Sequence, residues 1–400
     1  MTPTPSINRS HTHIIIFLGI LNALTPFTID LYLPAFGDIA ADLSTTVPKV
    51  SLSIATYFVG FALGQIIYGP LLDRFGRKLP LYGGLVLYIL ATVGCMTAKS
   101  VEALWVFRFL SALGGCASSV GALTMVRDFF KPEDAPKVFS MLMLVLSVSP
   151  LFAPSIGGWM AAHFGWRSIF GSLVGLATII LIIVAFGLPK KYEPDPNIKL
   201  EMGPIFKTYL DIFKIPQFRT YVLAGALSFS GLFVYLTGSP AIFIEGFQVS
   251  KEMFGLIFAL LATAMIGGGQ VNNFLLRKLT SETIFQRGVI CQIILSGLFL
   301  FVLATTTLSL VPTIVFFFLL LSCIGIAYPN SAALALKPLT KNVGSASALL
   351  GFVQMGAGAG LASMVGLFDV KGSIPTAAVI FVSSILAGTV LWVGARWKKT

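Results

Sequence analysis

The chain carries little charge for its length. Only 11% of its 400 residues are Asp, Glu, Lys or Arg, while 56% are apolar and the mean hydropathy is +0.90. A soluble domain carries about 25% charged residues. So much apolar surface cannot be hidden inside a water-facing globule. The composition excludes a soluble domain, a disordered chain and a nucleic-acid-binding protein, so nucleic acid is not an expected partner.

Residues that bind metals or nucleotides are also scarce. Four cysteines lie inside apolar segments without metal-ligand spacing, which excludes a disulfide-stapled domain and predicts no metal site. No G-x-x-x-x-G-K-[ST] sequence occurs, so we expect neither a nucleotide cofactor nor ATP drive. No acid, base and metal-ligating residues cluster at one membrane face, which argues against a membrane enzyme.

Long apolar runs fill the chain instead. Runs of about 20 residues, the length that crosses a bilayer as a helix, recur along the chain, six on each side of a polar stretch. The predicted spans are 14–36, 49–72, 79–98, 101–126, 137–162, 166–188, 218–243, 252–276, 284–306, 308–331, 342–367 and 374–395. The sequence therefore predicts an all-α polytopic membrane protein of twelve transmembrane helices, with halves at 1–188 and 218–400.

The positive charges orient these spans. Of the 27 Lys and Arg residues, 21 fall in segments on the same side as the N-terminus, five fall on the opposite side, and Arg108 lies inside a span. Lys and Arg accumulate in cytoplasmic loops. We therefore expect both termini in the cytoplasm and the protein in the cytoplasmic (inner) membrane.

The polar stretch 189–217 joins the halves. Its first part is charged and rich in Pro, as a linker would be. Its second part repeats apolar residues at helical spacing, which favours a short helix on the inner membrane surface over a solvated loop. The stripe consists of Ile205, Phe206, Tyr209, Leu210 and Phe213.

A specific motif follows the second predicted span. Residues 69–78 read GPLLDRFGRK. This resembles the major facilitator superfamily signature G-x-L-x-D-R-x-G-R-[KR], whose loop in that family is a latch between the halves. The resemblance implies this role for Gly69, Asp73, Arg74, Gly76 and Arg77. We expect Gly69 to let helices approach closely, whereas a loop that served topology alone would not require Gly and Asp at these places.

The fifth predicted span contains a second motif. Residues 149–158 read SPLFAPSIGG, which is similar to the family's antiporter motif with Ala153 in place of its first Gly. The matching residues are Pro150, Pro154, Gly157 and Gly158. Pro and paired Gly permit a bend and close packing, which alone would describe a kinked packing helix. The resemblance implies exchange of substrate for protons.

Residues of the first two predicted spans resemble one branch of this family in particular. The sequence IDLYLPA at 29–35, together with 52–78, resembles the Bcr/CflA branch of drug:proton antiporters, which includes exporters of bicyclomycin and chloramphenicol. Arg127-Asp128 and the GSASA sequence at 344–348 fit the same branch. This resemblance covers the whole chain and implies a monomer.

Two ionisable residues, Asp30 and Arg108, fall well inside predicted spans. Each costs at least about 2.5 kcal/mol to insert, which by default indicates function. Helical rise places both roughly 10 Å below the outer surface, so we expect them to meet, directly or through water. Burial favours a protonated carboxyl group and a guanidinium favours the ionised form. Asp30 is thus predicted to carry protons with Arg108 beside it; the alternative is a static ion pair that holds two spans together.

Other polar or aromatic residues lie on helices expected to line a central cavity. Each could bind substrate or form a hydrogen bond between helices. The candidates for substrate binding are Asn22, Asp30, Tyr57, Arg108, Ser111, Ser228, Tyr235, Tyr328 and Gln354.

Together these features predict proton-coupled efflux of small amphipathic compounds such as antibiotics. The expected partners are a small-molecule substrate, protons and the lipid bilayer. Three alternatives stay open: a dedicated transporter of a dipeptide, amino acid or siderophore, a membrane enzyme, and a passive channel.

Overall fold

The computed structural model describes residues 9–130, 135–187, 202–339, 343–367 and 373–397. All regular secondary structure in these ranges is helical. Eleven helical stretches in them have the length and apolar composition needed to cross a bilayer. The predicted all-α, multi-pass architecture is thereby confirmed in its coarse form.

The helices follow the predicted spans to within a few residues. From the second span onward they are α3 (Val47–Phe75), α4 (Lys78–Thr97), α5 (Val101–Phe129), α6 (Ala135–Phe164), α7 (Arg167–Gly187), α9 (Pro216–Pro240), α10 (Lys251–Leu275), α11 (Ser281–Thr305), α12 (Leu310–Leu336), α13 (Val343–Leu367) and α14 (Ile374–Trp397). The helix α6 spans 30 residues and coincides with the fifth predicted span, although some of its side chains lie outside the described residues.

Local sequence explains where several helices begin. Ser100, Ser250 and Thr280 precede α5, α10 and α11, and their side-chain oxygens accept hydrogen bonds from backbone N–H groups in the first turn. Such N-caps satisfy donors that have no partner inside the helix. Proline lies within the first two positions of α3 and α9, where no backbone donor is needed.

The first span departs from the prediction of one helix over 14–36. The helix α1 (Arg9–Asp30) ends at Asp30, and a turn leads into a short 3-10 helix, η1 (Leu33–Ala35), and then α2 (Phe36–Asp42). Pro34 explains the break, because it has no N–H to donate to the carbonyl of Asp30 four residues earlier.

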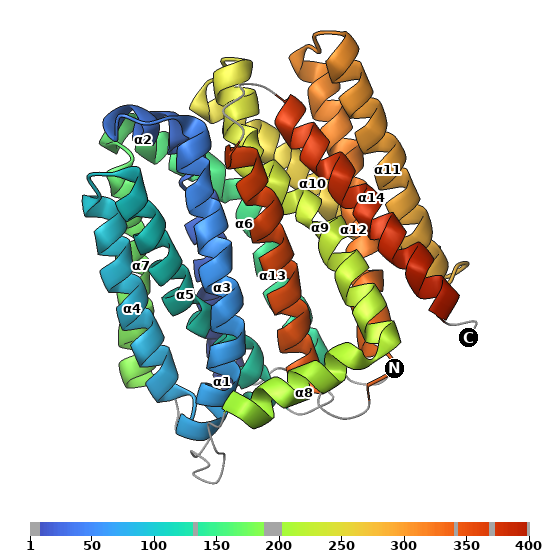
Figure 1. Ribbon diagram of the computed structural model, residues 1–400. Helices are drawn as coiled ribbons and strands as arrows, with labels where there is room; N and C mark the ends of the chain where they lie inside the picture. Colours follow the sequence, from blue (N-terminus) through green and yellow to red (C-terminus); the bar gives the residue numbers. More distant parts are fainter. Residues whose placement is uncertain (1–8, 131–134, 188–201, 340–342, 368–372, 398–400) are drawn as a thin grey trace.

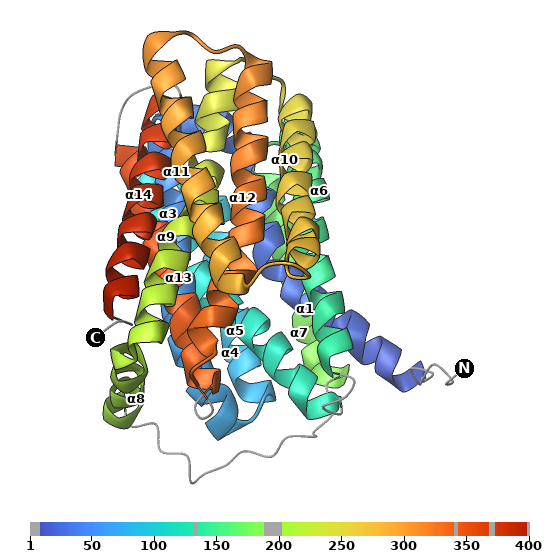
Figure 2. The same ribbon diagram turned by 90° about the vertical axis from the view of Figure 1, so that its right-hand side faces the viewer.

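The helices of the first half lie together on one side and those of the second half on the other (Figure 1). The most extensive contacts between the sides are those of α3 along α13 and of α6 along α10 (Figure 2). Within the first half, α3 and α5 come closest at Gly60 and Gly64, where an added β-carbon would meet the Phe109 carbonyl or the Cys116 side chain. The predicted close approach at Gly69 is wrong, since a β-carbon there would have no neighbour within 4 Å.

The predicted surface helix is present as α8 (Met202–Lys214). It runs across the lower ends of the other helices, roughly perpendicular to them (Figure 1). Tyr209 and Ile212 are buried, whereas Phe206 and Leu210 are 63% and 45% exposed. One side of α8 therefore packs on the helical bundle, through α9 and α13, and another apolar side is uncovered. The preceding linker, 188–201, lies outside the described residues.

Candidate functional site

The break in the first span leaves backbone acceptors without helical partners. The Leu31 N–H still donates to the Phe27 carbonyl four residues earlier. The next backbone hydrogen bond along the chain runs from the Ala35 N–H to the Tyr32 carbonyl, only three residues earlier. The carbonyl of Thr28 is therefore free of the helix and available to another donor. A buried carbonyl of this kind requires a partner.

Arg108 supplies that partner from α5. Its Nη1 donates to the Thr28 carbonyl oxygen at 3.1 Å. The side chain is fully buried, and its guanidinium carbon lies 4.3 Å from the Tyr32 ring centroid and 4.4 Å from that of Tyr57. A cation between two aromatic faces and at a helix C-terminus is favourably placed on both counts. Arg108 thus holds the broken end of α1.

Asp30 lies two residues beyond the carbonyl that Arg108 binds, but the two side chains do not pair. It is 4% exposed, and its carboxyl group forms no ion pair with Arg108 or with any other described residue. The expected direct contact is not formed, because Asp30 follows Thr28 by two residues and points about 200° around the helix from it.

Several polar atoms around Arg108 have no partner within the protein. They are Nε and Nη2 of Arg108, the hydroxyl of Tyr57 and the hydroxyl of Thr25, and all are buried. A buried polar group without a hydrogen bond costs about 1–3 kcal/mol. Hydrogen bonds with a bound molecule would satisfy these atoms, and Ser118, Ser149 and Trp166 of the first half have unpartnered buried atoms as well.

Two first-half candidates are already engaged inside the bundle. Asn22 donates to the Leu142 carbonyl at 3.4 Å and accepts from Ser119 at 3.5 Å, which links α1 to α6 and α5. The Ser111 hydroxyl donates to the Arg108 carbonyl within α5, at 2.9 Å. Both side chains therefore form hydrogen bonds that hold the bundle together, which was the alternative to substrate binding in the sequence analysis.

The antiporter-like motif in α6 lies against the break in the first span. Gly157 packs on the Leu31 carbonyl, and Gly158 packs on the backbone carbonyl of Lys251 at the start of α10. Ser155, one turn away, packs on Gly255 of α10 in the same manner. The small residues of the motif therefore bring the end of α1, α6 and the second half into close contact.

An ion pair adds to this contact, between the start of α10 and the short helix α2. Lys251 Nζ lies 2.5 Å from Asp38 Oδ2, joining α10 to α2 across the two halves. Each side chain is partly exposed, at 26% and 36%. Sequence reasoning missed the pair, because no local pattern relates two outer-loop residues so far apart in the chain.

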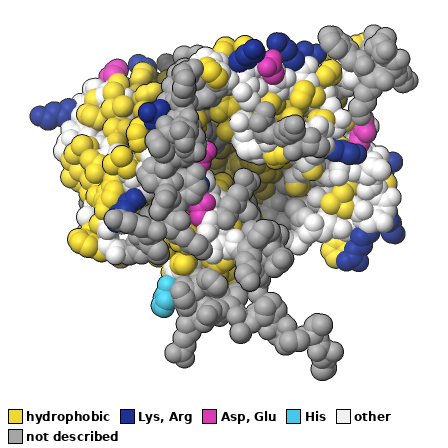
Figure 3. All heavy atoms as spheres, turned by 90° about the horizontal axis from the view of Figure 1, so that it is seen from below, with side chains coloured by type: hydrophobic (Ala, Val, Ile, Leu, Met, Phe, Trp, Pro, Cys, Tyr) yellow, Lys and Arg dark blue, Asp and Glu magenta, His cyan; other side chains and the backbone are white. Residues whose placement is uncertain are grey.

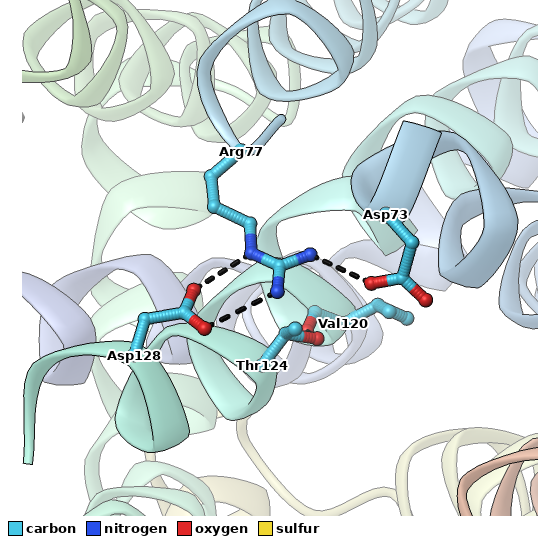
Figure 4. Close-up of polar contacts among 5 residues, drawn as sticks. All are labelled: Asp73, Arg77, Val120, Thr124 and Asp128. Carbon is cyan, nitrogen blue, oxygen red and sulfur yellow. Dashed lines mark hydrogen bonds and ion pairs between the residues drawn. The ribbon is translucent and has the colours of Figure 1, made fainter. Parts of the chain in front are cut away.

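The signature loop forms a compact charge network at the inner end (Figure 4). Arg77 donates to Asp73 at 2.9 Å and to both oxygens of Asp128 at 2.7 and 3.2 Å. Burial alone would lower the pKa of Arg77, but the hydrogen bonds that it donates to Asp128 and Asp73 outweigh burial and raise that pKa above its ordinary value. Gly76 ends α3 with φ of +75°, a conformation that favours glycine. Arg74 lies over the Phe75 ring.

The residues of the second half predicted to bind substrate lie in two separate environments. The Ser228 hydroxyl donates to Gln292 on α11 at 2.9 Å, inside the second half. Tyr328 stacks on Phe229 with ring centroids 4.3 Å apart and interacts with the Gln354 side chain. Phe233, one turn along α9 from Phe229, reaches Phe58 of the first half at 4.4 Å. The rings of Tyr328, Phe229, Phe233 and Phe58 thus form an aromatic row that crosses from the second half to the first.

The two ends of the molecule differ. At one end of the bundle, α6, α10 and α2 are joined by the packing and the ion pair described above. Seen from below, the molecule is hollowed near its centre, and the hollow shows apolar side chains (Figure 3). Within the described ranges, no three His, Cys, Asp or Glu side chains gather as they would around a metal ion.

A helical bundle with eleven described segments long and apolar enough to cross a bilayer is a multi-pass membrane protein. The profile of the Major Facilitator Superfamily matches residues 18–363, and the chain belongs to that family of transporters. This confirms the expectation that it is not an enzyme.

Individual relatives agree with the resemblance seen in the motifs. The chain is 31% identical over 378 residues to a bicyclomycin resistance protein homolog of Haemophilus influenzae, covering 93% of this chain and 94% of the relative. It is 29% identical to a chloramphenicol resistance protein of Pseudomonas aeruginosa (70% and 66% covered) and 26% identical to multidrug resistance protein D of Escherichia coli K12 (91% of each). These relatives place the chain with the Bcr/CflA branch.

Solved structures share the fold at low identity. A D-xylose-proton symporter superimposes with a TM-score of 0.75 at 14% identity, covering 96% of this chain and 97% of the other. An inward-facing bacterial homolog of the human lysosomal transporter Spinster gives 0.69 at 16%, covering 97% and 96%.

Proposed function

We propose that the protein exports small amphipathic compounds, including antibiotics, across the inner membrane in exchange for protons. The observation that carries this proposal is the position of Asp30. It is a buried carboxyl group at the break of a membrane-spanning segment, close to α9 and α10, and it forms no ion pair with any described residue. An ionised carboxylate there would be an uncompensated buried charge, so binding and release of a proton change the energy of the closed arrangement.

The proposed mechanism is alternating access between two six-helix halves, 1–188 and 218–400, with twelve spans and both termini in the cytoplasm. The closed outer end and the hollow at the lower face support an inward-facing arrangement. Opening the Asp38–Lys251 contact while the inner ends close would expose Asp30 to the outside. The Arg77 network fits a latch at the inner ends of that movement.

The driving force is sufficient for such exchange. One elementary charge crossing 100 mV provides about 2.3 kcal/mol. That sustains a concentration ratio of roughly fifty for a neutral substrate before any pH gradient is added.

The proposed substrate site lies along the aromatic row between the halves. Phe58, Phe229 and Tyr328 offer ring faces. Gln354 and the unpartnered donors of Arg108 offer polar anchors. Such a site suits an amphipathic molecule of modest size with few hydrogen-bonding groups.

The uncovered side of α8 fits the membrane surface in this arrangement. Phe206 and Leu210 would enter the lipid while Lys207 and Lys214 stay at the headgroups. A cysteine at Phe206 labelled with a depth-sensitive probe should then be shielded from water, whereas one at Asp211 should not.

The function is tested in proteoliposomes with an imposed pH gradient. Phenicols, bicyclic antibiotics, dipeptides and siderophores are added one at a time, and the collapse of the gradient and movement of the compound are recorded. Proton release with antibiotics supports the proposal. Exchange with dipeptides or siderophores alone would favour a metabolite transporter, and substrate movement indifferent to the gradient would reject proton coupling.

A further inference from the structure

Exposed cations gather where α10 and α11 join, on one flank of the second half. Both helices pack along α12, and the three lie side by side (Figure 2). The segment 276–280 connects the end of α10 to the start of α11. It contains Arg277 and Lys278, and Arg287 lies in the second turn of α11. All three side chains are exposed, and none forms an ion pair with a described residue.

The guanidinium group of Arg277 lies on an aromatic ring that faces away from the bundle. Its central carbon is 5.2 Å from the ring centroid of Phe274, and Phe274 is 65% exposed. Leu260 and Val271, on the same side of α10, are exposed as well. An exposed apolar face on a helix of membrane-spanning length is a lipid-facing surface. Arg277 therefore lies at the end of the lipid-facing surface of α10.

Arg287 has the equivalent place on α11. Ile290, Ile294 and Leu298 follow it at the spacing of one helical stripe and are all exposed. The buried residues of α11 lie on the opposite side of the helix. An arginine at the end of such a stripe lays its stem on apolar surface and extends its charge toward the lipid headgroups. The lipid-facing surfaces of both helices thus end in a cation near the same loop.

These cations have no counter-charge within the part of the chain that the structure describes. Glu282 is close in sequence, but it forms no ion pair with any of the three. It lies in the first turn of α11, where the helix dipole stabilises a negative charge. Arginine binds phosphate oxygens strongly through paired N–H groups. A ligand with phosphate at one end and apolar chains at the other would satisfy the cations and cover the apolar surfaces together.

We propose that the inner ends of α10 and α11 form a binding site for an anionic phospholipid. Arg277, Lys278 and Arg287 bind its phosphate groups, and the apolar faces of the two helices contact its acyl chains. Basic sites of this kind at the cytoplasmic ends of spans suit anionic headgroups. A zwitterionic lipid fits less well, because its own ammonium group offsets the phosphate charge. The site goes beyond the proposed function and does not depend on which compound is transported.

The test is native mass spectrometry of the full-length protein in detergent, with cardiolipin, phosphatidylglycerol or phosphatidylethanolamine added. Arg277→Gln combined with Arg287→Gln should weaken binding of the two anionic lipids by roughly thirtyfold, about fivefold for each arginine. Binding of phosphatidylethanolamine should not change. Both arginines are exposed, so the double variant should fold as the wild type does.

The matched control removes the same charge from another part of the inner face. Lys207→Gln combined with Lys214→Gln changes two exposed cations of α8, away from this flank (Figure 2), and should keep the wild-type affinity for anionic lipids. Equal weakening in the two double variants would overturn the site, because net charge alone would then explain the binding. Wild-type binding without preference for anionic lipids would overturn it too. Inorganic phosphate should not displace the lipid; displacement would show a site for soluble anions instead.

Discussion

The carbonyl group of Leu31 packs directly against the bare α-carbon of Gly157. Leu31 is the first residue after α1 ends, and Gly157 lies in the last third of α6. The motif in α6 therefore accommodates the break in the first span, one residue from Asp30. This contact connects the packing of a glycine motif to the residue proposed to carry protons.

Replacement of Gly157 by Ala should disturb this contact. Its β-carbon would overlap a backbone carbonyl that cannot turn away, so we expect a loss of about 1–3 kcal/mol and slower transport. Thermal unfolding in detergent measures the effect. Gly175→Ala in α7 is the control, because a β-carbon there meets nothing within 4 Å; equal melting temperatures for both variants would refute the packing argument.

The Asp38–Lys251 pair should hold the outer end closed. Asp38→Lys replaces attraction by repulsion, so a cysteine placed at Ser155 should react faster with a membrane-impermeant maleimide in a background lacking the native cysteines. The charge swap Asp38→Lys with Lys251→Asp should restore slow labelling. Asp42→Asn breaks the nearby ion pair with Arg167 inside the first half, at 2.7 Å, and should not change the labelling rate. Equal rates for Asp38→Lys and Asp42→Asn would contradict the assignment.

Asp128→Asn should weaken the network at the inner end. It takes the charge from a group that receives two hydrogen bonds from Arg77, and hydrogen bonds to charged groups contribute about 1.5–3 kcal/mol. We expect a lower melting temperature and slower transport. Asp211→Asn on α8 disrupts an exposed pair with Lys214 and should have little effect. A latch role would be excluded if Asp128→Asn transported and melted as the wild type does.

Arg108→Lys should lower stability although it keeps a positive charge. A lysine ammonium cannot lie flat between the Tyr32 and Tyr57 rings as the guanidinium does. Loss of a desolvated cation–π contact costs about 2 kcal/mol, and Arg108→Ala should cost more because the Thr28 carbonyl loses its donor. Melting curves of the two variants check the order. A lysine variant as stable as wild type would show that the rings are not essential.

The sequence predicted the helices well because each apolar run is long and is bounded by polar residues. It also predicted a common depth for Asp30 and Arg108 from helical rise, and Arg108 reaches the Thr28 carbonyl, two residues before Asp30. Their directions depend on where α1 ends and how it is rotated, which depth does not reveal. For this reason the direct contact was wrongly expected and the Thr28–Arg108 bond was not anticipated.

Tertiary packing accounts for the other differences. Gly69 lies in the signature, yet Gly60 and Gly64 make the close approach to α5, and nothing local in the sequence ranks one glycine of α3 above another. The Asp38–Lys251 pair joins loops of different halves, which only the assembled bundle brings together. Asp128 was noted as part of a family motif, but its partner Arg77 required the structure.

The central claim is that Asp30 carries the exchanged proton, and one comparison tests it most directly. Purified wild-type protein and Asp30→Asn are reconstituted, and transport of one substrate is measured twice, driven by a pH gradient and as counterflow without one. Loss of pH-driven transport with counterflow retained is the predicted result. Wild-type rates of pH-driven transport in the Asp30→Asn variant would contradict the account.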